Sequence, residues 1–434
     1  MTQLTSNFHK SDFAIKRLKK RHGREGRFRL YGRLAIAMAL VALIWLLVSL
    51  VGTGFTAFKQ NFMTLDVTLE ESVLDPSGSR DAQALRGANY RRIMQTTLYD
   101  LFPEVTDRRA KQELFALVSA SGSTNHIRQM VFNDPSLVGQ SMTITVPASD
   151  QVDQLIKGYI DREVPEARRK ISDQQIAWVD VLKDRGVIKS KFNHILFTKP
   201  DSRDPELAGI ASAVMGSIMI LAVAFVLAFP IGVGAAIYLD EFAPKNKFTD
   251  FIEININNLA AVPSIVFGLL GLAVFLNFFG MPRSIPLVGG MVLALRVFPT
   301  IIIATRASLR AVSPAIVDGA LSLGASRVQA VFQQKLPQAS PGILTGSIIG
   351  MAQALGETAP LLMIGMVAFV TEVPSSLMEP ATALPVQIFL WSDSAERAWS
   401  ERTSAAILVL LLVLVVMNGF AIWLRSRLEK NRKG

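Results

Sequence analysis

The sequence predicts an all-α membrane protein with six transmembrane spans and one α+β domain inserted outside the membrane. Half of the 434 residues are hydrophobic and only 18% are charged, which is too apolar for an average soluble protein. The apolar residues gather in stretches of about 20, the length that a helix needs to cross a bilayer. In contrast, the 148 residues from 59 to 206 carry 20 basic and 21 acidic residues, the composition of a folded domain in water.

Six apolar stretches are long enough to cross a membrane. They are residues 34–58, 211–239, 254–279, 285–305, 343–370 and 404–424. The fourth contains Arg296 and the fifth contains Glu357, whereas the other four are free of charge. The first stretch is too long for a signal peptide and no A-x-A cleavage pattern follows it, so we expect a retained anchor.

The net charge of +10 lies almost wholly at the two ends of the chain. Residues 1–33 have a net charge of +8 and residues 425–433 of +4, and the remainder sums to −2. Positive charge beside apolar stretches predicts that both termini are cytoplasmic and excludes a nucleic-acid-binding surface. Two inner ends require an even number of spans. The loops 306–335 (+3, inside) and 371–402 (−3, outside) agree with this topology, whereas the loop 240–253 (−2) opposes it weakly.

These patterns divide the chain into five parts. We expect a basic cytoplasmic tail at 1–33, a first transmembrane helix at 34–58, an extracytoplasmic α+β domain at 59–206, a five-helix membrane core at 207–424 with a cytoplasmic loop at 306–340, and a basic cytoplasmic tail at 425–434. Within the α+β domain, alternation predicts strands near residues 63–69 and 141–146. Helical spacing predicts helices at 90–102, 110–119, 150–160 and 165–183, the last with Pro165 in its first turn.

The sequence contains no signature of an enzyme. It has no phosphate-binding G-x-x-x-x-G-K-[ST] loop, no G-x-S-x-G elbow and no kinase pattern. The absence of Cys excludes thiolate metal sites and cysteine nucleophiles, and His126 and His194 stand alone without metal-ligand spacing. We therefore expect no catalytic residues, no metal and no cofactor, and any use of ATP must come from a partner.

The cytoplasmic loop carries a helix–glycine–helix pattern. Asp318, Gly319 and Ala320 precede Gly324, which supplies the backbone freedom for a turn. A second helix is expected to end before Leu336-Pro337, where the chain re-enters the membrane. By composition alone this is an ordinary loop, and only the order and spacing of its residues favour a docking segment.

The fifth stretch combines small residues with one acid. Its helix-packing residues Gly342, Gly346 and Gly350 recur every fourth residue with Ala354, a pattern that lets another helix approach closely. Glu357 follows three residues later on the same predicted face, so it should point into protein or a cavity because a charge in lipid is costly. Arg296, in the fourth stretch, is the basic residue that we expect to pair with it. Two interpretations stay open, a buried structural ion pair or a pair that lines an anion path.

Three motifs together resemble a known family. The segment from Asp318 to Gly324, with Leu336-Pro337, resembles the E-A-A-x-x-x-G motif of ABC importer permeases, although Asp318 and Gly319 replace the usual Glu and first Ala. Residues 258–269 and 356–361 resemble the A-type subunits (PstA) of the phosphate-specific permeases, and the similarity extends from about residue 207 to the C-terminus. Many members have Arg where this chain has Gln353, so the usual Arg–Glu pairing of that family does not transfer directly.

The resemblance implies a type I importer-like permease of the bacterial inner membrane, one transmembrane subunit of an ATP-driven importer of inorganic phosphate. It implies two ATP-binding subunits, a sister permease subunit and a periplasmic phosphate-binding protein as partners. Asp318, Gly319, Ala320, Gly324, Leu336 and Pro337 would contact the ATPase, and Arg296, Gln353, Glu357 and Thr358 are the candidate path residues. Residues 59–206 resemble an extra module of some members, with no implied role. The alternatives are a permease for another oxyanion, such as sulfate or molybdate, and a membrane receptor with an outer sensing domain.

Overall fold

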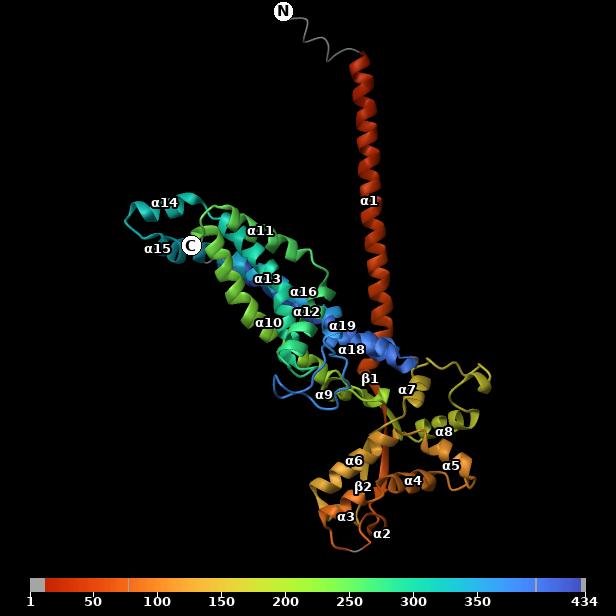
Figure 1. Ribbon diagram of the computed structural model, residues 1–434. Coiled ribbons are helices and arrows are strands. Elements are labelled where there is room, and N and C mark those ends of the chain that lie inside the picture. Colours follow the sequence, from red (N-terminus) through yellow and green to blue (C-terminus); the bar gives the residue numbers. More distant parts are fainter. Residues whose placement is uncertain (1–11, 77, 395, 431–434) are drawn as a thin grey trace, which may run out of the picture. The chain divides into compact units, whose positions relative to one another are not determined.

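The computed structural model describes residues 12–76, 78–394 and 396–430 (Figure 1). The ends of both predicted tails, including Arg432 and Lys433, lie outside the described residues. The chain forms two compact units, residues 1–53 and residues 54–434.

The first unit is one long helix, α1 (Asp12–Gly54), of 43 residues. It joins the basic segment and the apolar stretch without a break, so the predicted division between a tail and a span at residue 33 is not a boundary of secondary structure. Apolar side chains along its second half, such as Leu34, Val41 and Trp45, are exposed in this unit. Such a surface suits lipid rather than water.

The second unit begins with the α+β domain, which is built on an antiparallel sheet of three strands in the order β2-β1-β3. The strands are β1 (Lys59–Thr68), β2 (Ser141–Pro147) and β3 (Ile188–Phe192). The helices are α2 (Glu71–Leu74), α3 (Ala82–Gly87), α4 (Tyr90–Leu101), α5 (Arg108–Phe115), α6 (Ala120–Asn133), α7 (Asp150–Ile156), α8 (Asp173–Asp184) and α9 (His194–Thr198), with 3-10 turns η2 (Phe55–Phe58), η3 (Pro135–Leu137), η4 (Glu166–Arg168) and η5 (Pro205–Leu207).

The hydrophobic core of this domain lies on one face of the central strand. Met63, Leu65 and Val67 of β1 alternate into it and are at most 2% exposed. Met94 and Leu98 of α4 belong to the same buried cluster. The period of two along β1 is the pattern that predicted a strand here, because successive side chains point to opposite faces of a sheet.

Most predicted elements of the domain are confirmed, with corrections at their ends. The two predicted strands are β1 and β2, and the helix predicted at 90–102 is α4. The helix predicted at 110–119 ends at Phe115, and the one predicted at 150–160 ends at Ile156. The helix predicted at 165–183 is wrong in its first half. Its helix α8 begins only after Ser172, whose side chain forms a reciprocal capping box with Gln175. The elements α6 and β3 were not predicted.

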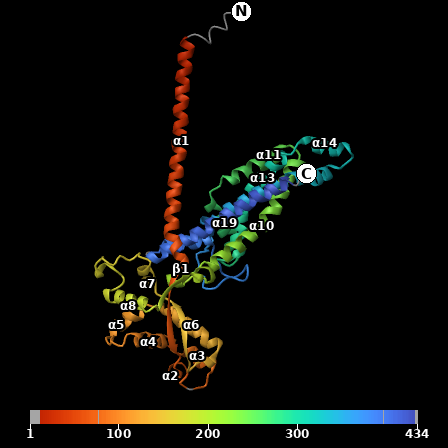
Figure 2. The ribbon, with the colours of Figure 1, turned by 180° about the vertical axis from the view of Figure 1, so that it is seen from behind.

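The rest of the second unit is a helical core. Its helices are α10 (Ala211–Ile237), α11 (Lys247–Ala260), α12 (Ser264–Gly271), α13 (Pro286–Arg310), α14 (Pro314–Ser322), α15 (Arg327–Gln329), α16 (Leu336–Leu355), α17 (Ala359–Met363), α18 (Leu384–Ser392) and α19 (Arg397–Lys430), with π-helical segments η6 (Tyr238–Phe242), η7 (Leu272–Phe278) and η8 (Ala330–Lys335). Helix α13 packs between α10 and α16, and α16 also packs against α19. Figure 2 shows α10, α13 and α19 along this core from behind.

The described residues contain four helices that are long and apolar enough to cross a membrane, or five if one bent pair is counted as a span. They are Leu18–Phe58, Ala211–Phe242, Pro286–Arg310 and Arg397–Leu428. Of the six predicted spans, the third and the fifth are not continuous helices. The third is α11 and α12 with η7, bent by 102° at the break before Pro263, because a proline disfavours helical backbone in the residue before it. The fifth stops as a helix at Leu355.

Candidate functional site

The predicted fifth span breaks at Gly356, Glu357 and Thr358. Helix α16 ends at Leu355, and the short α17 starts at Ala359 with Pro360 in its first turn. The backbone N–H of Glu357 donates to the carbonyl of Ala354 at 3.1 Å. Glu357 thus sits just beyond the end of α16, and the expectation that it continues the helical face of Ala354 is wrong.

The structure nevertheless brings Glu357 to Arg296. The Nη2 atom of Arg296, on α13, lies 3.3 Å from Oε1 of Glu357. The two side chains are 25% and 19% exposed. No other hydrogen bond or ion pair of the Arg296 side chain occurs among the described residues. Since a guanidinium has five N–H donors, most of its donors stay available to an anion.

The packing of α16 on α13 explains this meeting. A β-carbon added to Gly342 would lie 2.5 Å from the Ser308 side chain, and one added to Gly346 would lie 2.5 Å from that of Ala304. One added to Gly350 would lie 3.3 Å from Thr300. From each glycine to the next the residue number increases by four, whereas the number of the contacted residue on α13 decreases by four. The two helices are therefore antiparallel and in register. The next step of this register places Ala354 opposite residue 296. The end of α16, just after Ala354, therefore lies beside Arg296.

The other two candidate path residues differ in position. Thr358 is half-buried beside Glu357 in the break. Gln353 is exposed on α16, although its neighbours Ala352 and Ala354 are buried. The structure therefore groups Arg296, Glu357 and Thr358 at the break and leaves Gln353 on an uncovered surface of the unit.

The predicted helix–glycine–helix segment is partly as expected. Asp318, Gly319 and Ala320 lie on α14, and Gly324 has a φ of +90°, the left-handed conformation that favours glycine. The second helix does not end before Pro337. Instead η8 leads directly into α16, which has Pro337 in its first turn and Pro341 inside it. Proline is tolerated in a first turn, where its missing N–H would have no partner.

Two features of this segment could not be read from the sequence motif. Leu323 is 91% exposed next to the Gly324 turn, and Val328 is also exposed. Exposed apolar patches mark contacts with another protein or with the membrane. Figures 1 and 2 place α14 and α15 at the end of the helical core that is remote from the α+β domain.

Ion pairs secure the base of this segment to the helical core. Asp240, in η6, lies 2.7 Å from Nε of Arg310 and 3.7 Å from Nε of Arg306. Arg306 also contacts Glu253 of α11 at 2.6 Å, and Lys335 pairs with Glu241. These contacts join the end of α10 to α11, to the end of α13 and to η8. The α14 segment therefore leaves from and returns to a braced end of the core.

Comparisons with known proteins agree with this arrangement. Residues 228–430 match the family described as the binding-protein-dependent transport system inner membrane component, and residues 15–166 match a domain of unknown function, DUF3333. The chain is 32% identical over 238 residues to the probable ABC transporter permease protein YqgI of Bacillus subtilis, covering 51% of this chain and 79% of that protein. The chain belongs to this family of transport permeases.

Two further relatives of the permease carry more specific names. The phosphate transport system permease protein PstA of Xylella fastidiosa is 30% identical over 236 residues, which cover 54% of this chain and 81% of that protein. The phosphate transport system permease protein PstC of Haemophilus influenzae is 30% identical over 249 residues, which cover 52% and 77%. The permease is thus a multi-pass membrane protein and a subunit of an ABC importer, as the sequence motifs predicted.

Sequence reasoning missed the residues that join the α+β domain of the permease to α19. Lys157, which follows α7, lies 2.6 Å from Oδ2 of Asp153 and 2.8 Å from Oε1 of Glu401 on α19. All three side chains are at most 10% exposed. Gln154 donates to the other oxygen of Glu401 at 2.8 Å, and Asn61 of β1 donates twice to Asp153. A buried network therefore links β1, α7 and α19.

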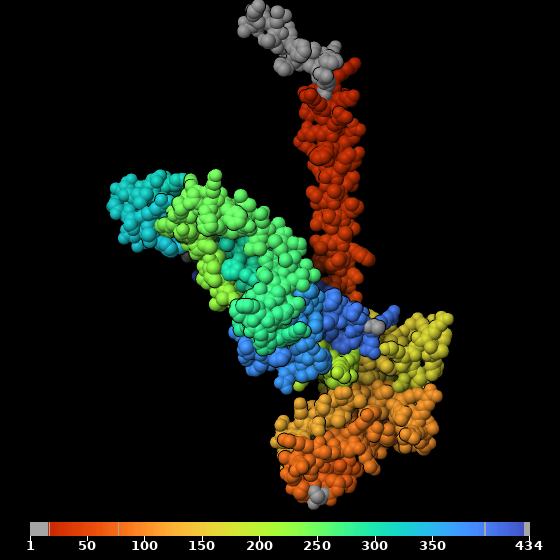
Figure 3. All heavy atoms as spheres, viewed as in Figure 1, coloured from red at the N-terminus to blue at the C-terminus, as the bar shows by residue number. Residues whose placement is uncertain are grey.

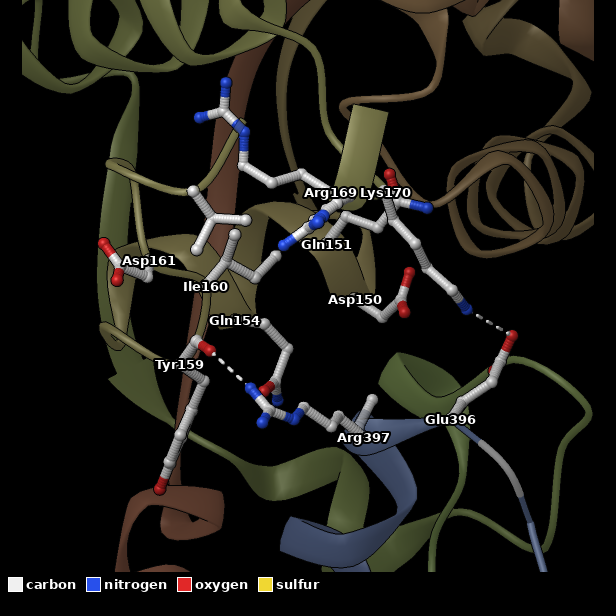
Figure 4. Close-up of a pocket in the computed structure, with 13 residues that line it drawn as sticks. Asp150, Gln151, Gln154, Tyr159, Ile160, Asp161, Arg169, Lys170, Glu396 and Arg397 are labelled. Atoms are coloured by element: carbon white, nitrogen blue, oxygen red, sulfur yellow. Dashed lines mark hydrogen bonds and ion pairs between the residues drawn. The ribbon is translucent and has the colours of Figure 1, made fainter. Parts of the chain in front are cut away.

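A pocket of about 390 Å³ lies beside this network (Figure 4). Figure 4 shows two bonds across it, from Arg397 of α19 to the carbonyl of Tyr159 at 3.1 Å and from Lys170 to Glu396 at 3.3 Å. In Figure 3 the blue atoms at the start of α19 lie against the yellow atoms of the segment after α7. Burial raises the pKa of Asp150 in this pocket, and the nearby charge of Glu396 adds to the increase.

Proposed function

We propose that this permease is one transmembrane subunit of an ATP-driven importer of inorganic phosphate, of the A type, in the bacterial inner membrane. The observation that carries the proposal is the half-buried Arg296, which Glu357 contacts at a helix break. Most N–H donors of its guanidinium remain without a partner in the described residues. The names of the relatives at 30% identity favour phosphate as the anion. Phosphate carries one to two negative charges near neutral pH, so an arginine in its path attracts it and a bare carboxylate repels it. Glu357 is thus a holder of Arg296 rather than a ligand of the anion.

Partner subunits that hydrolyse ATP supply the energy for transport. Two ATP-binding subunits contact the segment from Asp318 to Gly324 on the inner face, a sister permease subunit completes the path, and a periplasmic phosphate-binding protein delivers the anion. The exposed Leu323 and the braced base of α14 support this assignment, because motion of a docked partner would pass into α10, α11 and α13 through the ion pairs of Asp240 and Arg306. Alternating access then exposes the path to one side at a time.

The proposed topology places both termini in the cytoplasm and the α+β domain in the periplasm. The basic ends of the chain support this orientation. The separation of the α+β domain from α14, at opposite ends of the helical core, also supports it. The domain stands outside the path itself, because the residues of the break and of the coupling segment all belong to the helical core.

The test is transport by the reconstituted complex. The permease, its sister subunit and the ATPase are purified together after crosslinking and placed in liposomes with the binding protein. We expect ATP-dependent uptake of labelled phosphate that excess sulfate and molybdate do not reduce. Liposomes without ATP are the control. Uptake of sulfate or molybdate in place of phosphate would refute the substrate, and a permease that purifies without an ATPase would refute the proposed assembly.

A further inference from the structure

A pocket of about 500 Å³ opens on the α+β domain, away from the Arg296 site. It is bounded by α6, by the sheet, by α9 and by the segment that leads into α10. The residues that matter to its chemistry are Asn125, His126, Lys191, His194, Lys199 and Asp201. Its volume is that of a small-molecule site rather than of a single water.

The pocket has an excess of positive charge. Neither Lys191 nor Lys199 lies within ion-pair distance of a carboxylate in the described part of the chain. The one carboxylate in the lining, Asp201, accepts hydrogen bonds from the indole N–H of Trp391 at 3.0 Å and from the backbone of Ser202 at 2.9 Å. Burial raises the pKa of Asp201, whereas the hydrogen bonds that it accepts lower it. Two ammonium groups against one carboxylate leave this hollow with an excess of positive charge, which attracts an anion.

The walls of the pocket are held in place. The His194 ring stacks on the ring of the buried Phe62, with centroids 5.8 Å apart and planes within 9°. The backbone of Lys199 donates to the carbonyl of Ile195 at 3.0 Å and accepts from the N–H of Ala211 at 3.1 Å. Gly209 passes so close to Lys199 that a β-carbon there would lie 2.1 Å from its carbonyl oxygen. These contacts fix the backbone of Lys199 between the domain and α10.

Neutral hydrogen-bonding groups complete the lining. Burial, together with the charge of Lys199, lowers the pKa of His126, so its imidazole is neutral near pH 7 and offers one donor and one acceptor. Asn125 is its neighbour on α6, and Thr145 of β2 also lines the pocket. A protonated phosphate oxygen needs such an acceptor, and the unprotonated oxygens need the donors and the ammonium groups.

We propose that this pocket binds a small phosphate-bearing anion through Lys191 and Lys199. Inorganic phosphate and a phosphate monoester share the recognised group. The apolar wall formed by Phe62 and Ile195 would accommodate the organic part of a monoester. The site is separate from the Arg296 path, so it stands or fails independently of the proposed transport function. Because Asp201 bonds Trp391 of α18, a bound anion lies next to a contact between the domain and the helical core.

The experiment is equilibrium binding to the full-length permease in detergent, without its partners or ATP. Inorganic phosphate and glycerol 3-phosphate are titrated separately, by calorimetry and by tryptophan fluorescence. We expect saturable binding of at least one of them at one site per chain, and a change of fluorescence that Trp391→Phe removes while binding persists. The ligand that binds more tightly identifies the natural class.

The variants locate the site. Lys191→Gln with Lys199→Gln should weaken binding at least tenfold. The control, Lys111→Gln with Lys183→Gln, removes the same charge from positions that do not line the pocket and should leave the affinity unchanged. The proposal is overturned if neither ligand binds saturably, if the pocket variant binds like the unmodified chain, or if the control weakens binding equally.

Discussion

Neutralising the two partners of the Arg296–Glu357 pair separately and together is the sharpest test of the candidate path. At 3.3 Å the attraction between the two charges is about 5 kcal/mol for an effective dielectric constant of about 20. Removing one partner of a buried pair costs roughly 3 to 5 kcal/mol, and an unpaired charge at mid-membrane costs roughly 2.5 to 3.5 kcal/mol. Because both side chains keep some exposure, we expect about 3 kcal/mol for each single change, Arg296→Gln or Glu357→Gln.

The assay separates folding from transport. Abundance in the membrane and the thermal unfolding midpoint report stability, and labelled phosphate uptake is normalised to the amount of permease. Both single variants should lose abundance. The double variant should recover abundance, because no unpaired charge is left, but should not recover uptake if Arg296 guides the anion. Arg427→Gln is the charge-matched control, since Arg427 lies over the Trp423 ring near the end of α19.

Two results would contradict this reasoning. Full uptake by Arg296→Gln alone, at normal abundance, would show that this arginine does not line the path. Recovery of both abundance and uptake in the double variant would show that the pair is only structural. In either case the proposed role of Glu357 as the holder of a path residue would have to be abandoned.

Three further predictions concern other parts of the permease. Gly324→Leu should insert normally but uncouple ATP hydrolysis from uptake, because the φ of +90° at residue 324 is strained for Leu by roughly 1 to 2 kcal/mol. The control Gly319→Ala, on α14 with open space around the added β-carbon, should hydrolyse ATP and transport as the unmodified protein does. Normal coupling in Gly324→Leu would count against the docking assignment. Lys157→Met should destabilise the junction by roughly 3 to 5 kcal/mol, seen as faster proteolysis between the α+β domain and the core, because the buried Glu401 carboxylate loses its ion-pair partner. The exposed Lys170→Met should cost less than about 1 kcal/mol, and equal effects would refute the buried network. Burial raises the pKa of Glu206 to about 7, so the folded state binds more protons than the unfolded state between about pH 4.5 and 7. Stability should therefore fall as pH rises through that window, by about 3 kcal/mol at most. Glu206→Gln should flatten this pH dependence of the thermal unfolding midpoint, and an unchanged slope would assign it to other groups.

The sequence determined the parts of this fold that depend on local patterns. Apolar runs of sufficient length marked the long helices, because a bilayer-spanning helix needs about 20 apolar residues whatever its neighbours are. Alternation along residues 63–69 marked β1, because one face of that strand is buried. Gly324 marked a turn, since only glycine takes the left-handed conformation at no steric cost. The glycines of α16 likewise predicted a close contact with another helix, but not which helix would make it.

Tertiary structure decided what lies far apart in the sequence or leaves no periodic trace. Strand β3 buries only Ile188, so no alternation marks it, and α6 buries Ser123, Ile127 and Val131 within a polar sequence that favours no helix. The break after Leu355 could not be separated from a continuous apolar span by composition. Lys157 and Glu401 are 244 residues apart in the chain. Their pairing exists only because packing of α7 on α19 removes both charges from water, and a buried charge must then find a partner.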